Sequence, residues 1–196
     1  NRNTAMKLFG LLGLLMLLSC GYADRHRNNS SCEQVLVDSL EVRVQDSLFS
    51  NVHYSRSQVL DALTQAQDSQ VYYRLLALYG KTFFVSSDFD SILYYNRRVK
   101  EFSRNASQSS ESLQSPRWND VLSDVYNIEG NVWMQLNRPD SAITDYKKAY
   151  EYRLKGKKLH LLPDICINTA DAYLHRSDLA HTASYYRRAL FLCDSL

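Results

Sequence analysis

Two stretches near the end of the chain decide its fold: YNIEGNVWMQLNRPDSAITDYKKAYEY at residues 126–152 and CINTADAYLHRSDLAHTASYYRRALFL at residues 166–192. They align without a gap at a constant offset of forty residues. Small residues recur where two helices must come close, and large aromatic residues recur in the gaps beside them. The aligned pairs are Gly130 with Ala170, Trp133 with Tyr173, Tyr146 with Tyr186, and Ala149 with Ala189. Because one helical hairpin cannot bury both of its faces, this pattern predicts hairpins that stack on their neighbours.

An earlier stretch, LALYGKTFFVSSDFDSILYYNRRVKEF at residues 76–102, carries the same pattern in a weaker form. Its offset from the stretch at residues 126–152 is fifty residues, and five of its positions match: Gly80, Phe83, Asp90, Ser91 and Val99. Asn96 stands where the other two stretches have a tyrosine, although Tyr95 is adjacent. We therefore predict three related helical hairpins, the first of them degenerate.

The three stretches resemble the tetratricopeptide repeat, a helix-turn-helix unit of about 34 residues. The wider spacing here is explained by two inserts, KGKKLH at residues 155–160 and SRNASQSSESLQS at residues 103–115. Ser115 and Pro116 then form an N-cap and first helical residue that restart the array. The resemblance implies an all-α fold, a superhelical stack of antiparallel helix hairpins, with repeats at 73–104, 116–154 and 163–196. The array is expected to continue beyond this fragment, since no polar capping helix follows the last repeat.

A separate helical hairpin is predicted ahead of the repeats, over residues 33–70. Apolar residues recur at close to helical spacing from Glu33 to about Phe49, and again from Gln58 to Ala66. The residues that carry this periodicity are Val35, Leu36, Leu40, Val44 and Leu48 in the first helix, and Val59, Leu60 and Leu63 in the second.

The beginning of the chain has the features of an export signal. Met6 and Lys7 precede an apolar run over residues 8–18, which is too short for a membrane-spanning helix of about 20 residues. Leu17-Leu18-Ser19-Cys20 resembles a bacterial lipobox, which implies a signal peptide over residues 1–19, lipidation of Cys20 and a flexible tether over residues 20–32. The alternative is an ordinary signal peptide, cut near Gly21 or Ala23, that would release a secreted protein.

Composition and motifs exclude several classes of function. The chain has 23 basic and 21 acidic side chains and lacks a long basic block, so nucleic-acid binding is not expected. The sequence contains no nucleophile elbow, phosphate loop, zinc-protease motif or dinucleotide fingerprint, and we expect neither enzymatic activity nor a cofactor. None of the five histidines lies three or four residues from another, so no metal site is expected.

Two cysteines lie at opposite ends of the last predicted hairpin. Cys166 is near the start of its first helix and Cys193 near the end of its second, which antiparallel packing would bring to one level. An exported protein is in a compartment that permits disulfides. The sequence leaves two interpretations, a Cys166–Cys193 disulfide or two small core residues.

The resemblance also implies a binding groove lined by the first helix of each hairpin. The candidate groove residues are Lys81, Asn127, Asn131, Gln135, Asn168, Asp171 and His175. Asn131 and Asn168 occupy positions at which peptide-clamping members of the family hold a peptide with asparagines. Asn127 stands where those members have a lysine, which weighs against carboxylate recognition. The alternative is that these residues are an ordinary solvated helix surface.

The triplet Asp-Ser-aliphatic occurs five times, beginning at Asp38, Asp46, Asp90, Asp140 and Asp194. It resembles an O-glycosylation motif of exported proteins in one phylum of Gram-negative bacteria. Asp and Ser also favour helix starts, and two of the triplets begin predicted second helices. Both interpretations stay open from the sequence.

These features together predict a non-enzymatic scaffold that is lipid-anchored in the cell envelope and holds a protein or peptide in its groove. Proteins of this appearance resemble the extracytoplasmic input regions of bacterial sensor-regulators, which implies a role in signal transduction. Two alternatives remain: a glycan- or nutrient-binding uptake lipoprotein, which would need exposed aromatic platforms, and an enzyme domain beyond Leu196.

Overall fold

The computed structural model describes residues 33–106 and 115–195, and within these ranges the regular structure is entirely helical. The prediction of an all-α fold is confirmed. The helices are residues 33–47, α2 (Val52–Gln65), α3 (Ser69–Lys81), α4 (Phe89–Ala106), α5 (Pro116–Gln135), α6 (Pro139–Leu154), the short 3-10 helix η2 (Leu159–Leu161), α7 (Leu162–His175) and α8 (Leu179–Ser195). The signal peptide, Cys20 and the tether predicted over residues 1–32 lie outside these ranges. None of the described helices is long and apolar enough to cross a membrane.

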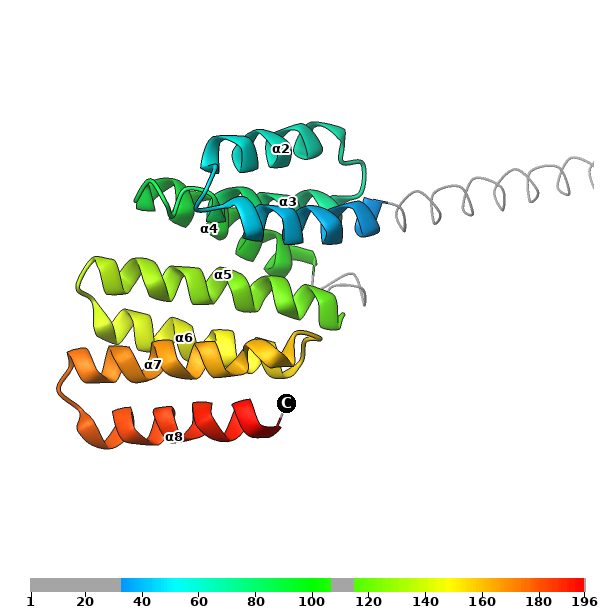
Figure 1. Ribbon diagram of the computed structural model, residues 1–196. Coiled ribbons are helices and arrows are strands. Elements are labelled where there is room, and N and C mark those ends of the chain that lie inside the picture. Colours follow the sequence, from blue (N-terminus) through cyan, green and yellow to red (C-terminus); the bar gives the residue numbers. More distant parts are fainter. Residues whose placement is uncertain (1–32, 107–114, 196) are drawn as a thin grey trace, which may run out of the picture.

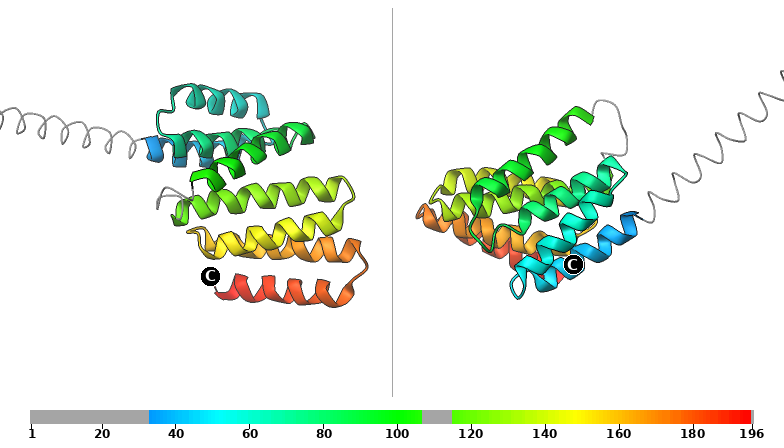
Figure 2. Two further views of the ribbon diagram at one scale, coloured as in Figure 1. Left: turned by 180° about the vertical axis from the view of Figure 1, so that it is seen from behind. Right: turned by 90° about the horizontal axis from the view of Figure 1, so that it is seen from above.

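Consecutive helices run antiparallel and pack side by side. In Figure 1, α5, α6, α7 and α8 follow one another down the molecule, and α2 lies at the opposite end. The helix over residues 33–47 lies beside α3, as the views in Figure 1 and Figure 2 show. The described chain therefore has a repeat-like helical architecture.

One turn geometry recurs in all three predicted repeats. Ser87, Asn137 and Ser177 have φ angles of 54°, 56° and 60°, and they are separated by the same fifty and forty residues as the sequence stretches. The residue after each one donates its backbone N–H to the carbonyl five positions earlier, a bond that closes a helix C-terminus. These bonds are Asp88 to Phe83 at 3.2 Å, Arg138 to Trp133 at 2.8 Å, and Asp178 to Tyr173 at 3.0 Å.

Local signals fix where several helices begin. Ser115 caps α5, since its hydroxyl accepts the backbone N–H of Trp118 at 3.2 Å, and Pro116 occupies the first turn. The predicted restart at Ser115-Pro116 is confirmed. Asp68 caps α3 in the same way, accepting the N–H groups of Gln70 and Val71 at 2.7 and 3.1 Å. Prolines also occupy the first turns of α6 and α7, where their missing N–H costs no hydrogen bond.

Gly130 permits the close approach of α5 and α6. A Cβ atom at this position would lie 2.3 Å from Cε1 of Tyr146, so only glycine leaves room for the buried ring. The Tyr146 hydroxyl donates to Asn131 Oδ1 at 2.7 Å, and Tyr186 donates to Asp171 in the equivalent place on α7 and α8. In the degenerate first repeat, Asn96 takes the position of these tyrosines and donates from Nδ2 to the Val125 carbonyl at 3.2 Å.

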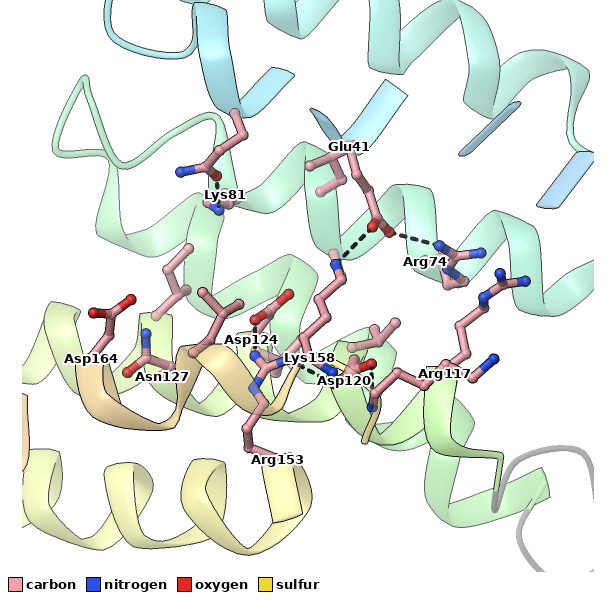
Figure 3. Close-up of a pocket in the computed structure, with 18 of the residues that line it drawn as sticks. Glu41, Arg74, Lys81, Arg117, Asp120, Asp124, Asn127, Arg153, Lys158 and Asp164 are labelled. Carbon is pink, nitrogen blue, oxygen red and sulfur yellow. Dashed lines mark hydrogen bonds and ion pairs between the residues drawn. The ribbon is translucent and has the colours of Figure 1, made fainter. Parts of the chain in front are cut away.

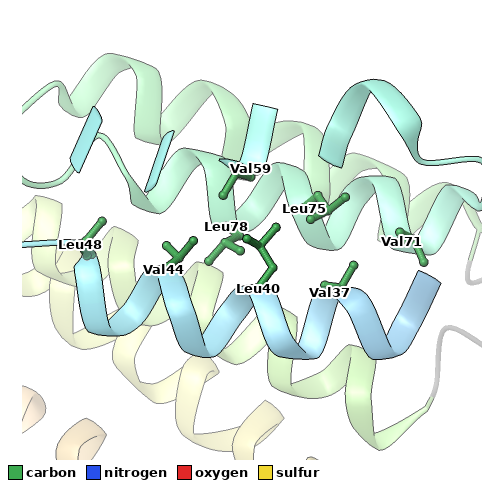
Figure 4. Close-up of a cluster of buried hydrophobic side chains, with 8 residues drawn as sticks. All are labelled: Val37, Leu40, Val44, Leu48, Val59, Val71, Leu75 and Leu78. Atoms are coloured by element: carbon green, nitrogen blue, oxygen red, sulfur yellow. The ribbon is translucent and has the colours of Figure 1, made fainter. Parts of the chain in front are cut away.

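The core is a chain of apolar clusters, each shared between neighbouring helices. The first joins residues 33–47, α2 and α3, and consists of Val37, Leu40, Val44, Leu48, Val59, Val71, Leu75 and Leu78 (Figure 4). The second joins α3, α4 and α5 around Trp118, and the third joins α5, α6 and α7 around Tyr146. Because α3 contributes to the first two clusters, it packs against helices before it and after it in the chain.

The predicted helix over Gln58–Ala66 is longer than expected, since α2 begins at Val52. The start of α2, VHYSRS at residues 52–57, shows no helical periodicity of apolar residues. Asn51 starts the helix instead, because its side chain accepts the backbone N–H of Tyr54 at 3.1 Å.

Candidate functional site

A polar cavity of about 700 Å³ opens between the two halves of the described chain (Figure 3). One wall is formed by residues 33–47 and α3, and the other by α5, the start of α7 and the loop at residues 155–161. We call this hollow the polar cavity. Its lining includes six acidic and six basic side chains: Asp38, Glu41, Asp46, Asp120, Asp124 and Asp164, with Arg74, Lys81, Arg117, Arg153, Lys157 and Lys158.

Arg74 organises the first wall. Its side chain is only 3% exposed, and Nη2 pairs with Asp38 at 2.6 Å and with Glu41 at 2.9 Å. Each of these carboxylates also reaches a second cation across the cavity: Asp38 pairs with Arg117 at 2.8 Å, and Glu41 with Lys158 at 3.0 Å. The Nε and Nη1 atoms of Arg74 are buried and have no hydrogen-bond partner.

Asp120 organises the second wall. Its buried carboxylate accepts from Arg153 Nη1 at 2.8 Å and from the backbone N–H groups of Lys157 and Lys158 at 2.9 and 3.2 Å. Arg153 also pairs with Asp124. A Cβ atom on Gly156 would lie 2.1 Å from Asp120 Oδ1, so the loop can wrap this carboxylate only with glycine there.

Lys81 lies at the end of α3 and faces the cavity. Its Nζ donates to the neutral Gln45 Oε1 at 2.5 Å, and the described residues place no carboxylate within ion-pair distance of it. Burial lowers the pKa of Lys81, although the negative charge of Asp124 acts in the opposite direction. The ammonium group is therefore held in the cavity at a desolvation cost.

A second hollow of about 440 Å³ lies on α5 and α7, and we call it the asparagine hollow. It is lined by Phe84, Asn131, Met134, Gln135, Tyr146, Asn168, Asp171, Leu174 and His175. Asn168 donates from Nδ2 to Asn127 Oδ1 at 3.1 Å, and Asn127 lines the polar cavity. This hydrogen bond therefore links the two hollows.

All seven predicted groove residues line one of these hollows. Lys81 and Asn127 lie in the polar cavity, and the other five lie in the asparagine hollow: Asn131, Gln135, Asn168, Asp171 and His175. Two of them already have partners within their own hairpin, because Tyr146 donates to Asn131 and Tyr186 to Asp171. Gln135 and His175 are exposed and free to meet a ligand.

Apart from Lys81, sequence reasoning missed the charged residues that line the polar cavity. Glu41 and Lys158 are 117 residues apart, and Arg153 and Asp120 are 33 apart, so no short-range spacing reveals either pair. The one available signal was the insert KGKKLH. This insert interrupts the repeat spacing, and in the structure Gly156, Lys157 and Lys158 lie around Asp120.

The structure corrects the interpretation of the two cysteines. Cys166 and Cys193 are both free thiols, and they differ in burial: Cys166 is buried in α7, whereas Cys193 is exposed on α8. The disulfide is therefore not formed, and only Cys166 is a core residue. Burial raises the pKa of the Cys166 thiol, which lowers its thiolate fraction near neutral pH.

The Asp-Ser triplets have a structural explanation in the described residues. The third residue is fully buried in four of them, at Leu40, Leu48, Ile92 and Ala142. The Ser91 hydroxyl donates a hydrogen bond to Asp88 Oδ2 at 2.7 Å. The side chains of Ser39, Ser141 and Ser195 are exposed. The aliphatic residue of the motif is thus explained by packing.

Residues 33–106 and 115–195 contain no group of three or more His, Cys, Asp or Glu side chains that could hold a metal ion. Comparison of the chain with known protein-family models and with curated proteins gave no match.

Proposed function

We propose that the protein is a non-enzymatic interaction scaffold that holds an extended peptide segment of a partner protein against α5 and α7. The observation that carries this proposal is the grouping of all seven sequence-derived groove residues into two adjoining hollows. Amide side chains such as Gln135 and Asn168 can each donate to and accept from a peptide backbone. Such a surface can hydrogen-bond the backbone of a bound peptide whatever the peptide's side chains are.

The repeat-like architecture supports a stack of the tetratricopeptide type. The support comes from the recurring left-handed turn residues and from the paired contacts of Tyr146 with Asn131 and Tyr186 with Asp171. In such stacks the first helices of successive hairpins present one continuous binding surface. We propose that α5 and α7 have this role here.

A peptide library displayed on phage, selected against the protein, tests the proposal. Asn168→Ala and Gln135→Ala should each weaken selected peptides by about tenfold, because each removes hydrogen bonds worth roughly 1 kcal/mol or more. Lys147→Ala and Glu151→Ala on α6 are matched controls and should leave affinity unchanged. Peptides that bind the variants and the native protein equally would show that this surface is not the site.

The export signal and the lipobox resemblance at residues 6–20 support a location on a bacterial envelope membrane, with the scaffold outside the cytoplasm. A role as the input region of a signalling or transcription regulator extends this proposal. Glycan uptake receives less support, because Trp118 is 1% exposed and Trp133 is half-buried and donates to Asp145 at 2.8 Å. Both indoles are thus engaged in the fold. The exposed aromatic side chains of the described residues, Phe49, Tyr54, Tyr94 and Phe191, come from different parts of the chain.

A further inference from the structure

Both walls of the polar cavity mix acidic and basic side chains, and some of these have bonding capacity that no neighbour meets. On the first wall, Arg74 has three buried N–H groups on Nε and Nη1 without a partner, and Lys81 meets only the neutral Gln45. A buried donor left without an acceptor costs roughly 1–3 kcal/mol, and more when it is charged. This wall therefore favours a ligand that brings a negatively charged acceptor.

The second wall has carboxylate oxygens without a partner, and it also has one buried donor without a partner, Arg153 Nε. Asp164 has no hydrogen bond or ion pair within the described residues, and Asp124 uses only Oδ1, for Arg153. Figure 3 shows Lys81 above the hollow, with Asp124 and Asp164 below it. A ligand with a positively charged donor on its far side would meet these carboxylates.

Ligands with one kind of charge fit the cavity poorly. A simple anion beside Arg74 would satisfy one wall and be repelled by Asp124 and Asp164. A polyamine would satisfy the acids and be repelled by Arg74 and Lys81. The volume of about 700 Å³ is within the range of small-molecule sites, roughly 300–1,000 Å³.

We propose that the polar cavity binds a small zwitterion, a free amino acid or a short peptide with both termini free. Its carboxylate lies toward Arg74 and Lys81, and its ammonium group lies toward Asp124 and Asp164. The proposal goes beyond the peptide scaffold function and does not depend on it, because the asparagine hollow can hold a partner whether or not the cavity is filled.

Thermal unfolding of the protein with the free amino acids and a collection of dipeptides tests this inference. A ligand that binds the native state raises Tm in proportion to its excess over Kd. We expect at least one zwitterion to raise Tm, and we expect its N-acetyl and C-amide forms to bind at least tenfold more weakly by calorimetry. If no amino acid or dipeptide raises Tm at millimolar concentration, or if the capped forms bind as well, the inference is wrong.

Two variants assign the binding to this cavity. Lys81→Met and Asp164→Asn should each weaken the zwitterion at least tenfold, and Lys148→Met, on the exposed surface of α6, is the matched control. Amide exchange gives an independent measurement, because residues 33–47 form one wall and should become more protected when the ligand binds. Binding that survives both cavity variants would overturn the assignment. Loss of library peptides in Asn168→Ala with zwitterion binding intact would separate the two proposals.

Discussion

The carboxylate of Glu129 is almost fully buried in α5, and a single ion pair balances its charge. Its side chain is 5% exposed, and Lys100 on α4 donates to Oε2 at 2.6 Å. Burial raises the pKa of Glu129, and the neighbouring Lys100 acts in the opposite direction. The pair joins α4, in the degenerate first repeat, to α5, in the second repeat. The sequence between these two helices belongs to the insert at residues 103–115.

Removing Lys100 should destabilise the protein in a pH-dependent way. Lys100→Met leaves Glu129 buried and unpaired, which costs about 3 kcal/mol when the carboxylate is charged. Because the pKa of Glu129 is higher in the folded than in the unfolded state, protonation favours the folded state as pH falls through the folded pKa. Urea unfolding should therefore show a larger loss at pH 8 than at pH 5.

The control for this prediction is the double variant Lys100→Met with Glu129→Gln. It carries no buried charge, so its difference from the native protein should depend much less on pH. Lys148→Met removes another lysine, one that is 47% exposed and pairs with Asp145 at 3.6 Å, and it should cost under about 1 kcal/mol because Asp145 keeps its hydrogen bond from Trp133. An equal loss for Lys100→Met at both pH values would mean that the protonation of Glu129 does not change between pH 5 and pH 8.

At the scale of elements, the segment over residues 155–161 is the insert that lengthens the spacing between repeats, and it forms part of the wall of the polar cavity. Its backbone N–H groups and Arg153 together satisfy Asp120, which is 4% exposed. Gly156→Ala would push a Cβ atom into this carboxylate and break that arrangement.

We expect Gly156→Ala to cost about 3 kcal/mol, the range for disrupting a buried, hydrogen-bonded charge. Amide exchange at Lys157 and Lys158 should accelerate, because these N–H groups lose their acceptor. Lys155→Ala in the same loop is the control, and an exposed side chain of this kind should change stability by less than about 0.5 kcal/mol. A stable Gly156→Ala protein with protected amides would show that the loop can move aside at little cost.

The elements themselves could be predicted from sequence wherever a local rule operates. Ser115 and Pro116 predict a helix start, and Gly130 with Tyr146 predicts a close approach of two helices. Both signals lie within one hairpin, so they can be recognised from nearby residues in the sequence. The start of α2 was missed because residues 52–57 show no apolar periodicity and Asn51 determines the start by one hydrogen bond. The groove residues could be grouped because they share one helix face, whereas Arg74 could not be joined to its acids without knowing how residues 33–47 pack.

At the scale of the whole molecule, residues 33–47 are held to the later helices by charges and to α2 and α3 by apolar packing. Asp38 and Glu41 each bridge Arg74 on α3 to a cation on the far side of the polar cavity. The two far cations, Arg117 and Lys158, are 38% and 40% exposed, whereas Arg74 is 3% exposed. Asp38 and Glu41 thus each pair with one buried cation, Arg74, and with one partly exposed cation across the cavity.

This asymmetry predicts different costs for the two halves of the network. Asp38→Asn with Glu41→Gln leaves the Arg74 guanidinium buried without a counter-charge and should cost about 3–5 kcal/mol in urea unfolding. Arg117→Gln with Lys158→Gln removes only the solvated pairings and should cost about 1 kcal/mol per pair or less. The second variant should still speed amide exchange in residues 33–47 and near residue 158 together, because the cavity walls then lose their cross-links. Equal costs for the two variants would mean that Arg74 finds other acceptors, and that the acids hold the walls together without being needed to balance a buried charge.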